Sequence, residues 1–138
     1  MLVDDDKDDQ MIFLSAINEI DKRIACECYN DARRGLQVLQ MNTGEKPHCI
    51  FVDLNLPFMH GFEFLRKIKT MQGLENIPVI IYSTSSRESD RTKAKELGAF
   101  NFLSKPANIT ELKVRIAELL SGVPGCEEIV HQVTLNKS

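Results

Sequence analysis

Short apolar runs alternate along the chain with longer segments whose apolar residues recur every three or four positions. The short runs lie at 2–3, 24–29, 49–52, 79–82 and 101–104, and they are typical of strands. The longer segments are typical of helices. The first ends near residue 21, the second is 32–41, the third begins near residue 62, the fourth is 87–97 and the fifth begins after residue 108. Such alternation predicts a parallel sheet of five strands with helices on both faces and right-handed crossovers.

The predicted helices differ in how much apolar surface they offer to a core. In the first helix, the predicted core-facing residues are Met11, Phe13, Leu14, Ile17 and Ile20. The second helix offers Leu36 and Leu39, and the third offers Leu65 and Ile68. The helix at 87–97 has only Ala94 and Leu97 as apolar anchors. We therefore expect it to be the least stable of the five, because few apolar contacts hold it.

Length and composition narrow the class of protein. The 138 residues suffice for one domain with its own core, and 43% hydrophobic with 27% charged residues is ordinary for a soluble globular protein. A net charge of −3 argues against a nucleic-acid surface. No apolar run approaches the ~20 residues of a membrane span. The four cysteines include no CxxC pair, so we expect small buried thiols and a reducing cytoplasm.

Polar residues of complementary chemistry stand at the ends of four predicted strands. Asp4 and Asp5 end the first, Asp53 the third, Ser83 the fourth and Lys105 the fifth. In a parallel sheet these ends share one edge, where α/β folds bind ligands. Two carboxylates ~4 Å apart repel by about 4 kcal/mol at an effective dielectric near 20, so the cluster calls for a cation. Oxygen ligands with room for water favour Mg²⁺ over Ca²⁺.

Three acidic residues near the predicted strand ends have simpler interpretations. Asp53 alone could cap the turn that follows it, as many Asp residues do. Asp8 and Asp9 are explained by the preference of negative charge for a helix start.

Four motifs together resemble the receiver domain of two-component response regulators over about residues 1–121. They are Val3-Asp4-Asp5, the segment from Val52 to Pro57 with Gly61, the hydroxyl of Ser83, and Lys105-Pro106. The resemblance implies a flavodoxin-like (βα)5 fold, a doubly wound parallel sheet with strand order 2-1-3-4-5. Residues 122–138 are then expected to form a loose or partner-dependent tail.

The resemblance also implies a role for each site residue. Asp53 would be the phosphoacceptor, and Mg²⁺ would be held by Asp4, Asp5, Asp53 and the Asn55 backbone carbonyl. Lys105 would pair with the phosphoryl group, with Ser83 as the switch hydroxyl and Phe102 as the aromatic switch residue. The resemblance also suggests a cis Lys105–Pro106 bond, which would direct the Lys105 side chain toward the phosphoryl oxygen. His60 and Ala107 depart from the usual pattern without touching the proposed chemistry.

The implied function is a phosphorylation-controlled signalling module. A sensor histidine kinase or phosphotransfer protein would supply the phosphoryl group, and output would pass through a protein–protein surface. No nucleic-acid or membrane partner is expected from the net charge and the short apolar runs, and the resemblance allows a homodimer through the fourth and fifth helices. No further domain follows residue 121, so a stand-alone receiver is expected, not an enzyme beyond assisting its own phosphorylation and dephosphorylation. The acidic opening and the length are similar to those of small regulators that serve phytochrome-type sensor kinases.

Three alternatives are less well supported by the residues. A receiver-like scaffold that works without phosphorylation would not need every acidic, hydroxyl and lysine position filled. An aspartyl-phosphate phosphohydrolase usually has a second Asp two residues after its nucleophile, where this chain has Asn55. A flavin-binding flavodoxin relative would have a Ser/Thr/Gly-rich loop after its first strand, where this chain has carboxylates.

Overall fold

The computed structural model describes residues 1–41 and 44–127 and has the predicted α/β fold. Five parallel strands form one sheet in the order β2-β1-β3-β4-β5. The strands are β1 Leu2–Val3, β2 Cys28–Tyr29, β3 Ile50–Val52, β4 Val79–Ser83 and β5 Asn101–Ser104. The helices are α1 Lys7–Ile20, α2 Ala32–Met41, α3 Gly61–Thr70, α4 Glu88–Glu96 and α5 Ile109–Ser121. The flavodoxin-like strand order that the resemblance to receiver domains implies is confirmed.

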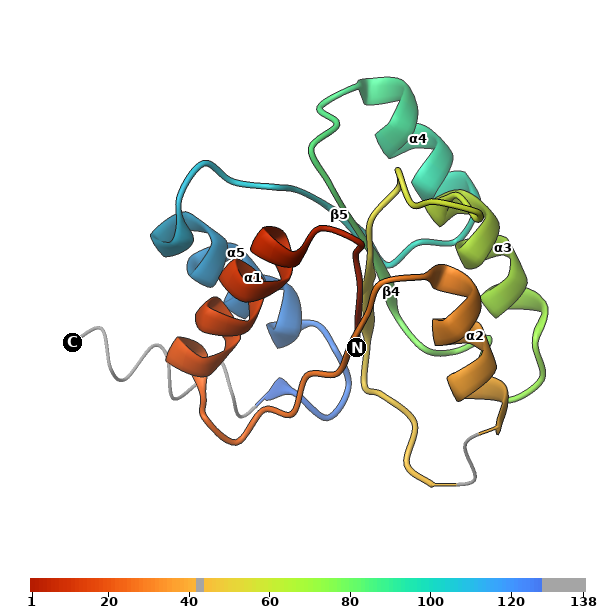
Figure 1. Ribbon diagram of the computed structural model, residues 1–138, viewed down its shortest axis with the longest axis horizontal. Helices are drawn as coiled ribbons and strands as arrows, with labels where there is room; N and C mark the ends of the chain where they lie inside the picture. The colour runs from red at the N-terminus through yellow and green to blue at the C-terminus, as the bar shows by residue number, and fades with distance from the viewer. Residues whose placement is uncertain (42–43, 128–138) are drawn as a thin grey trace.

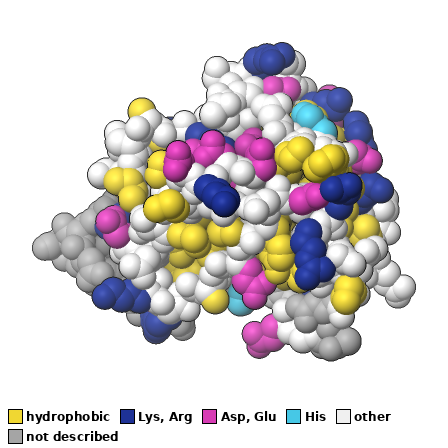
Figure 2. Space-filling model, viewed as in Figure 1, with side chains coloured by type: hydrophobic (Ala, Val, Ile, Leu, Met, Phe, Trp, Pro, Cys, Tyr) yellow, Lys and Arg dark blue, Asp and Glu magenta, His cyan; other side chains and the backbone are white. Residues whose placement is uncertain are grey.

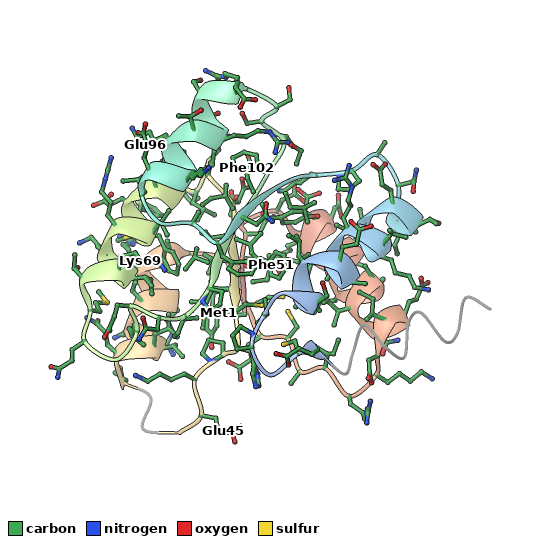
Figure 3. The ribbon with its side chains drawn as sticks, turned by 180° about the vertical axis from the view of Figure 1, so that it is seen from behind. Met1, Glu45, Phe51, Lys69, Glu96 and Phe102 are labelled. Atoms are coloured by element: carbon green, nitrogen blue, oxygen red, sulfur yellow. The ribbon has the colours of Figure 1, made fainter. Side chains whose placement is uncertain are left out.

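Helices cover both faces of the sheet (Figure 1), with α1 and α5 on one side and α2, α3 and α4 on the other. Alternate strand residues enter the two cores, so Leu2 packs toward α1 and α5 while Val3 packs toward α2 and α3. Seen from behind (Figure 3), Phe51 lies on the α1–α5 side and Phe102 lies beside α4. Coverage of both faces explains why β3 and β4 are buried along their whole length.

Strand β2 is shorter than the predicted run at 24–29. It pairs with β1 only through Leu2 with Cys28 and Val3 with Tyr29. Because β1 itself has two residues, it offers no further ladder partners. Cys26 nevertheless packs against the α1–α5 core.

The buried face of α1 is displaced from the predicted stripe. Met11 is 66% exposed and Leu14 is 38% exposed, so the prediction that they face the core is wrong. The buried residues are Phe13, Ala16, Ile17 and Ile20. These positions follow the i, i+3, i+4, i+7 spacing of one helix face, and the small Ala16 completes it.

The packed region continues beyond the predicted boundary at Ser121. Val123 and Cys126 are buried in the α1–α5 core, which gives the chain after α5 a fixed course up to that point. The rest of the predicted tail, from residue 128, lies outside the described residues, as do residues 42–43, which follow the second predicted helix. Within the part of the chain that is described, no helix has the length and apolarity to cross a bilayer.

Candidate functional site

Backbone hydrogen bonds bring the polar strand ends together at the carboxyl edge of the sheet. The N–H of Asp53 donates to the carbonyl of Val3 at 3.0 Å, which places Asp53 beside Asp4. The N–H of Lys105 donates to the carbonyl of Ser83 at 2.7 Å, so the end of β5 is tied to the end of β4. Asp4, Asp53, Ser83 and Lys105 therefore gather as the sequence predicted.

The ammonium group of Lys105 lies among three carboxylates. Its Nζ is 2.8 Å from Oδ2 of Asp4, 2.8 Å from Oδ2 of Asp9 and 3.1 Å from Oδ2 of Asp53. The Lys105 side chain is only 9% exposed. A lysine ammonium has three N–H donors, so these three contacts use its whole donor capacity.

Burial and charge pairing act against each other at this site. Burial raises the pKa of Asp4, although the hydrogen bond from Lys105 opposes that change. Burial by itself would lower the pKa of Lys105, but hydrogen bonds to Asp4 and Asp9 outweigh it, and the pKa is raised. The lysine is therefore held in its charged form, because it is the cation that balances buried carboxylates.

Asp4, Asp5 and Asp53 form a group whose ligand oxygens all lie within 4.8 Å of one another. Asp4 is fully buried, Asp53 nearly so, and Asp5 is exposed, so the group opens to solvent on one side. Oxygen donors with an open side fit Mg²⁺, which keeps several waters. Acidic side chains crowd the surface over the start of α1 (Figure 2). The N–H of Asn55 donates to Oδ1 of Asp53 at 3.4 Å, and the metal role of its carbonyl stays a prediction.

Asp9 is the site residue that sequence reasoning missed. The preference of negative charge for a helix start explains Asp9 from the sequence alone, and Asp9 does lie in the first turn of α1. In addition, its carboxylate contacts Lys105, 96 residues away in sequence. The available signal was its place in the first turn of the helix, because helical side chains tilt toward the N-terminus and so toward the strand end.

The loop after Asp53 folds back tightly on the strand end. The N–H of Gly61 donates to the carbonyl of Leu54 at 2.8 Å, and a Cβ at Gly61 would lie 2.3 Å from the carbonyl oxygen of Asp53. Only glycine permits this approach. His60, which departs from the usual pattern, caps α3 by accepting the N–H of Phe62 on Nδ1 at 3.1 Å. The departure is therefore structural, and it fixes the far end of the loop.

The predicted switch residues lie along the β4–α4 side of the site. Ser83 is buried, and its Oγ accepts the N–H of Ser85 at 3.2 Å. Phe102 is half-buried, with the Arg91 guanidinium 4.8 Å from its ring centroid. Arg91 also donates to Oγ of Ser104 at 2.8 Å, and that hydroxyl donates to the carbonyl of Ser85 at 3.1 Å. The loop, α4 and β5 are thus joined by a few polar contacts.

Two further expectations concern α4 and Pro106. Helix α4 buries only Ala94, with Leu97 partly buried beside it, as predicted. The prediction of a cis Lys105–Pro106 bond is wrong, since the described residues contain no cis peptide bond. With the trans bond, Lys105 still reaches Asp53, because its backbone is fixed by the carbonyl of Ser83.

Comparison with known proteins agrees with the fold. The response regulator receiver domain model matches residues 1–117. Sporulation initiation phosphotransferase F of Bacillus subtilis is 32% identical over 113 residues, which are 82% of this chain and 89% of that protein. The phosphorylated cyanobacterial phytochrome response regulator RcpA superposes with a TM-score of 0.80 at 26% identity, covering 90% of this chain and 91% of that one. The Mn²⁺-bound response regulator Rcp1 gives 0.71 at 29% identity, covering 88% and 90%. The chain therefore belongs to the response regulator receiver domain family of two-component signalling.

Proposed function

We propose that Asp53 of this receiver domain accepts a phosphoryl group in a Mg²⁺-dependent reaction, and that this modification controls a protein–protein surface. The donor is a sensor histidine kinase or a phosphotransfer protein, and the setting is the cytoplasm. The observation that carries the proposal is the placement of Asp53. One of its oxygens is 3.1 Å from the Lys105 ammonium, and its carboxylate belongs to the group formed with Asp4 and Asp5.

The proposed chemistry is a transfer between two covalent carriers. A carboxylate oxygen of Asp53 attacks phosphorus, the bond to the donor's histidine nitrogen breaks, and an acyl phosphate forms. Mg²⁺ held by Asp4, Asp5, Asp53 and the Asn55 carbonyl would neutralise charge on the phosphoryl oxygens. Lys105 then exchanges its contact with the Asp53 carboxylate for one with a phosphoryl oxygen. The chain assists its own phosphorylation and dephosphorylation in this way and needs no other enzymatic activity.

In this proposal, Ser83 and Phe102 transmit the effect of phosphorylation from Asp53 to helix α4. A phosphoryl oxygen would accept a hydrogen bond from the Ser83 hydroxyl, worth about 1.5–3 kcal/mol because the acceptor is charged. Such an energy shifts a two-state equilibrium by roughly one to two decades. Movement of Ser83 would pull on the N–H of Ser85 and, through Ser104, on Arg91 and the Phe102 ring. Helix α4 is the element most easily reshaped, since it buries a single residue.

The altered surface is the one formed by α4, β5 and α5, which would bind a downstream protein or a second copy of the chain. Nucleic acid is not a proposed partner, in keeping with the net charge of −3.

Phosphorylation is tested with acetyl phosphate and Mg²⁺, followed by intact-mass measurement. We expect one phosphoryl adduct on the wild type and none on Asp53→Asn. Asp31→Asn is the matched control, because Asp31 pairs with Arg33 outside the site, and it should be labelled like the wild type. A persistent adduct on Asp53→Asn would mean that another residue is the acceptor.

The signalling step is tested by hydrogen exchange across residues 84–104 with and without phosphorylation. Ser83→Ala should still be phosphorylated but should lose the exchange difference, because the hydroxyl that links the phosphoryl group to the loop is absent. If the variant keeps the full difference, Ser83 does not couple the site to α4.

A further inference from the structure

The ion pair between Asp9 and Lys105 is not used by the proposed function, although neither of the other two ion pairs of Lys105 is shorter. Nζ of Lys105 is 2.8 Å from Asp9 and from Asp4, and 3.1 Å from Asp53. Asp9 supplies one of the three acceptors that the ammonium group needs. Without Asp9, one N–H of the ammonium group would need a water molecule as its acceptor. Water reaches this side chain poorly, because only 9% of it is exposed.

The three carboxylates differ in what else they can bind. Asp4 and Asp53 belong to the group whose oxygens lie close enough to share a cation, and Asp9 does not. In the proposed reaction, Asp4 and Asp53 would hold the metal, and Asp53 also loses its free carboxylate when the acyl phosphate forms. Among the described residues, Asp9 is then the one ion pair of Lys105 that neither event removes.

The position of Asp9 is fixed by the start of α1. Its N–H donates to Oδ1 of the N-cap Asp6 at 3.0 Å, and the N–H of Asp6 donates to Oδ1 of Asp4 at 2.9 Å. Gln10 adds a further tie by donating from Nε2 to the carbonyl of Asp4. The first helical turn and the end of β1 are therefore one connected unit.

The lysine is held at both of its ends. Its backbone N–H donates to the carbonyl of Ser83 at 2.7 Å, and its ammonium reaches Asp9 on the opposite side of the site. A flexible side chain anchored in this way keeps its charge at a defined place next to Asp53 without relying on Asp53 itself.

We propose that Asp9 is a positioning residue, which holds the Lys105 ammonium at Asp53 while metal and phosphoryl group occupy the other two carboxylates. The inference rests on the proposed function, since it assigns to Asp9 a role in phosphoryl transfer. It also predicts an effect on metal binding. Without Asp9, Lys105 would form ion pairs with Asp4 and Asp53 alone and would compete with the cation for their oxygens.

The first experiment compares Asp9→Asn, Asp9→Glu and the matched control Asp8→Asn. Asp8 is exposed in the same helical turn and makes no ion pair among the described residues, so its change removes the same charge without the Lys105 contact. Phosphorylation is followed by intact mass over a range of acetyl phosphate concentrations at saturating Mg²⁺. Loss of a group that orients a site residue typically costs about 10- to 100-fold. We expect Asp9→Asn to lower the maximal rate about tenfold relative to Asp8→Asn, with the same half-saturating donor concentration, and Asp9→Glu to restore most of the rate.

Three outcomes of that experiment would overturn the inference. Equal maximal rates for Asp9→Asn and Asp8→Asn would show that the contact has no role in the reaction. Equal losses in Asp9→Asn and Asp9→Glu would indicate a structural role only. A faster reaction in Asp9→Asn would mean that Asp9 restrains Lys105 instead of positioning it.

A second experiment does not depend on phosphorylation. The rise in melting temperature is measured as a function of Mg²⁺ concentration for the same variants. Asp9→Asn should need about ten times more Mg²⁺ than Asp8→Asn for the same rise. A wild type that binds Mg²⁺ but takes no phosphoryl group would contradict the proposed function, whereas identical Mg²⁺ dependence of the two variants would contradict the role of Asp9.

Discussion

The carboxyl end of the sheet buries charged groups, whereas the amino end buries thiols and aliphatic side chains. Asp4, Asp53 and Lys105 meet at the carboxyl end. At the amino end, Cys49 precedes β3, and Val123 and Cys126 follow α5 into the same core. The position of Gly125 beside the His48 ring confirms that this segment lies against the approach to β3.

The same burial has opposite consequences at the two ends. Burial raises the pKa of the Cys49 thiol to about 11, so the group stays neutral and needs no charged partner. In the part of the chain that the structure describes, Lys105 is the cation that pairs with the carboxylates at the other end. The amino end therefore stabilises the fold by itself, and the carboxyl end depends on a cation, which makes it the end that can respond to a ligand.

The largest effect is expected from placing a charge at the amino end. Val123→Asp would bury a carboxylate in an apolar core and should lower the free energy of unfolding by about 3 kcal/mol or more. Ser121→Asp adds the same charge at an exposed position two residues earlier and should change it by less than about 0.5 kcal/mol. Urea denaturation measures both. Similar losses in the two variants would show that the segment after α5 is not packed.

The carboxyl end should gain stability when a cation is supplied. Mg²⁺ at 100 times its dissociation constant should add about 2.7 kcal/mol to the free energy of unfolding, because it relieves repulsion among Asp4, Asp5 and Asp53. Asp5→Ala should raise the melting temperature of the metal-free protein and abolish the response to Mg²⁺, while Asp8→Ala should keep the response. A wild-type melting temperature that does not change on addition of millimolar Mg²⁺ would argue against a metal site.

The smallest effect is expected on the free energy of unfolding at alkaline pH, and it comes from the Cys49 thiol. The unfolded chain releases the Cys49 proton above its ordinary pKa of 9.0, whereas the folded chain retains it until the pKa of about 11. Stability should therefore fall as pH rises from 9 to 11, by up to about 1.4 kcal/mol per pH unit from this group. Cys49→Ala should show a shallower fall in pH-dependent urea denaturation. An unchanged slope would mean that the thiol is not held neutral by the fold.

The five parallel strands and the gathering of Asp4, Asp53, Ser83 and Lys105 could be predicted because both follow from local patterns, whereas the strand order was implied by the resemblance to receiver domains. Apolar runs and turn residues mark the strands, and a parallel sheet places all their carboxyl ends together. What could not be predicted depends on how elements meet in space. The extent of β2 is set by the two residues of β1, and the exposure of Met11 and Leu14 is set by which face of α1 meets α5.

Asp9 belongs to the same class of unpredicted features. Its charge is explained equally well by a helix start and by a contact with Lys105, and only the rotation of α1 about its axis distinguishes the two. A sequence pattern gives the period of a helix, but its orientation relative to a strand end is decided by tertiary packing.

The long sequence separation of the Lys105 ion pairs has a consequence for chain synthesis. Lys105 is 101 residues from Asp4, 96 from Asp9 and 52 from Asp53. On the ribosome, β1, α1 and β3 therefore emerge well before the residue that balances their carboxylates. A nascent chain that stops short of β5 carries an acidic cluster without its internal cation, and Mg²⁺ from the surrounding solution is the counterion that can take its place until the last strand is added.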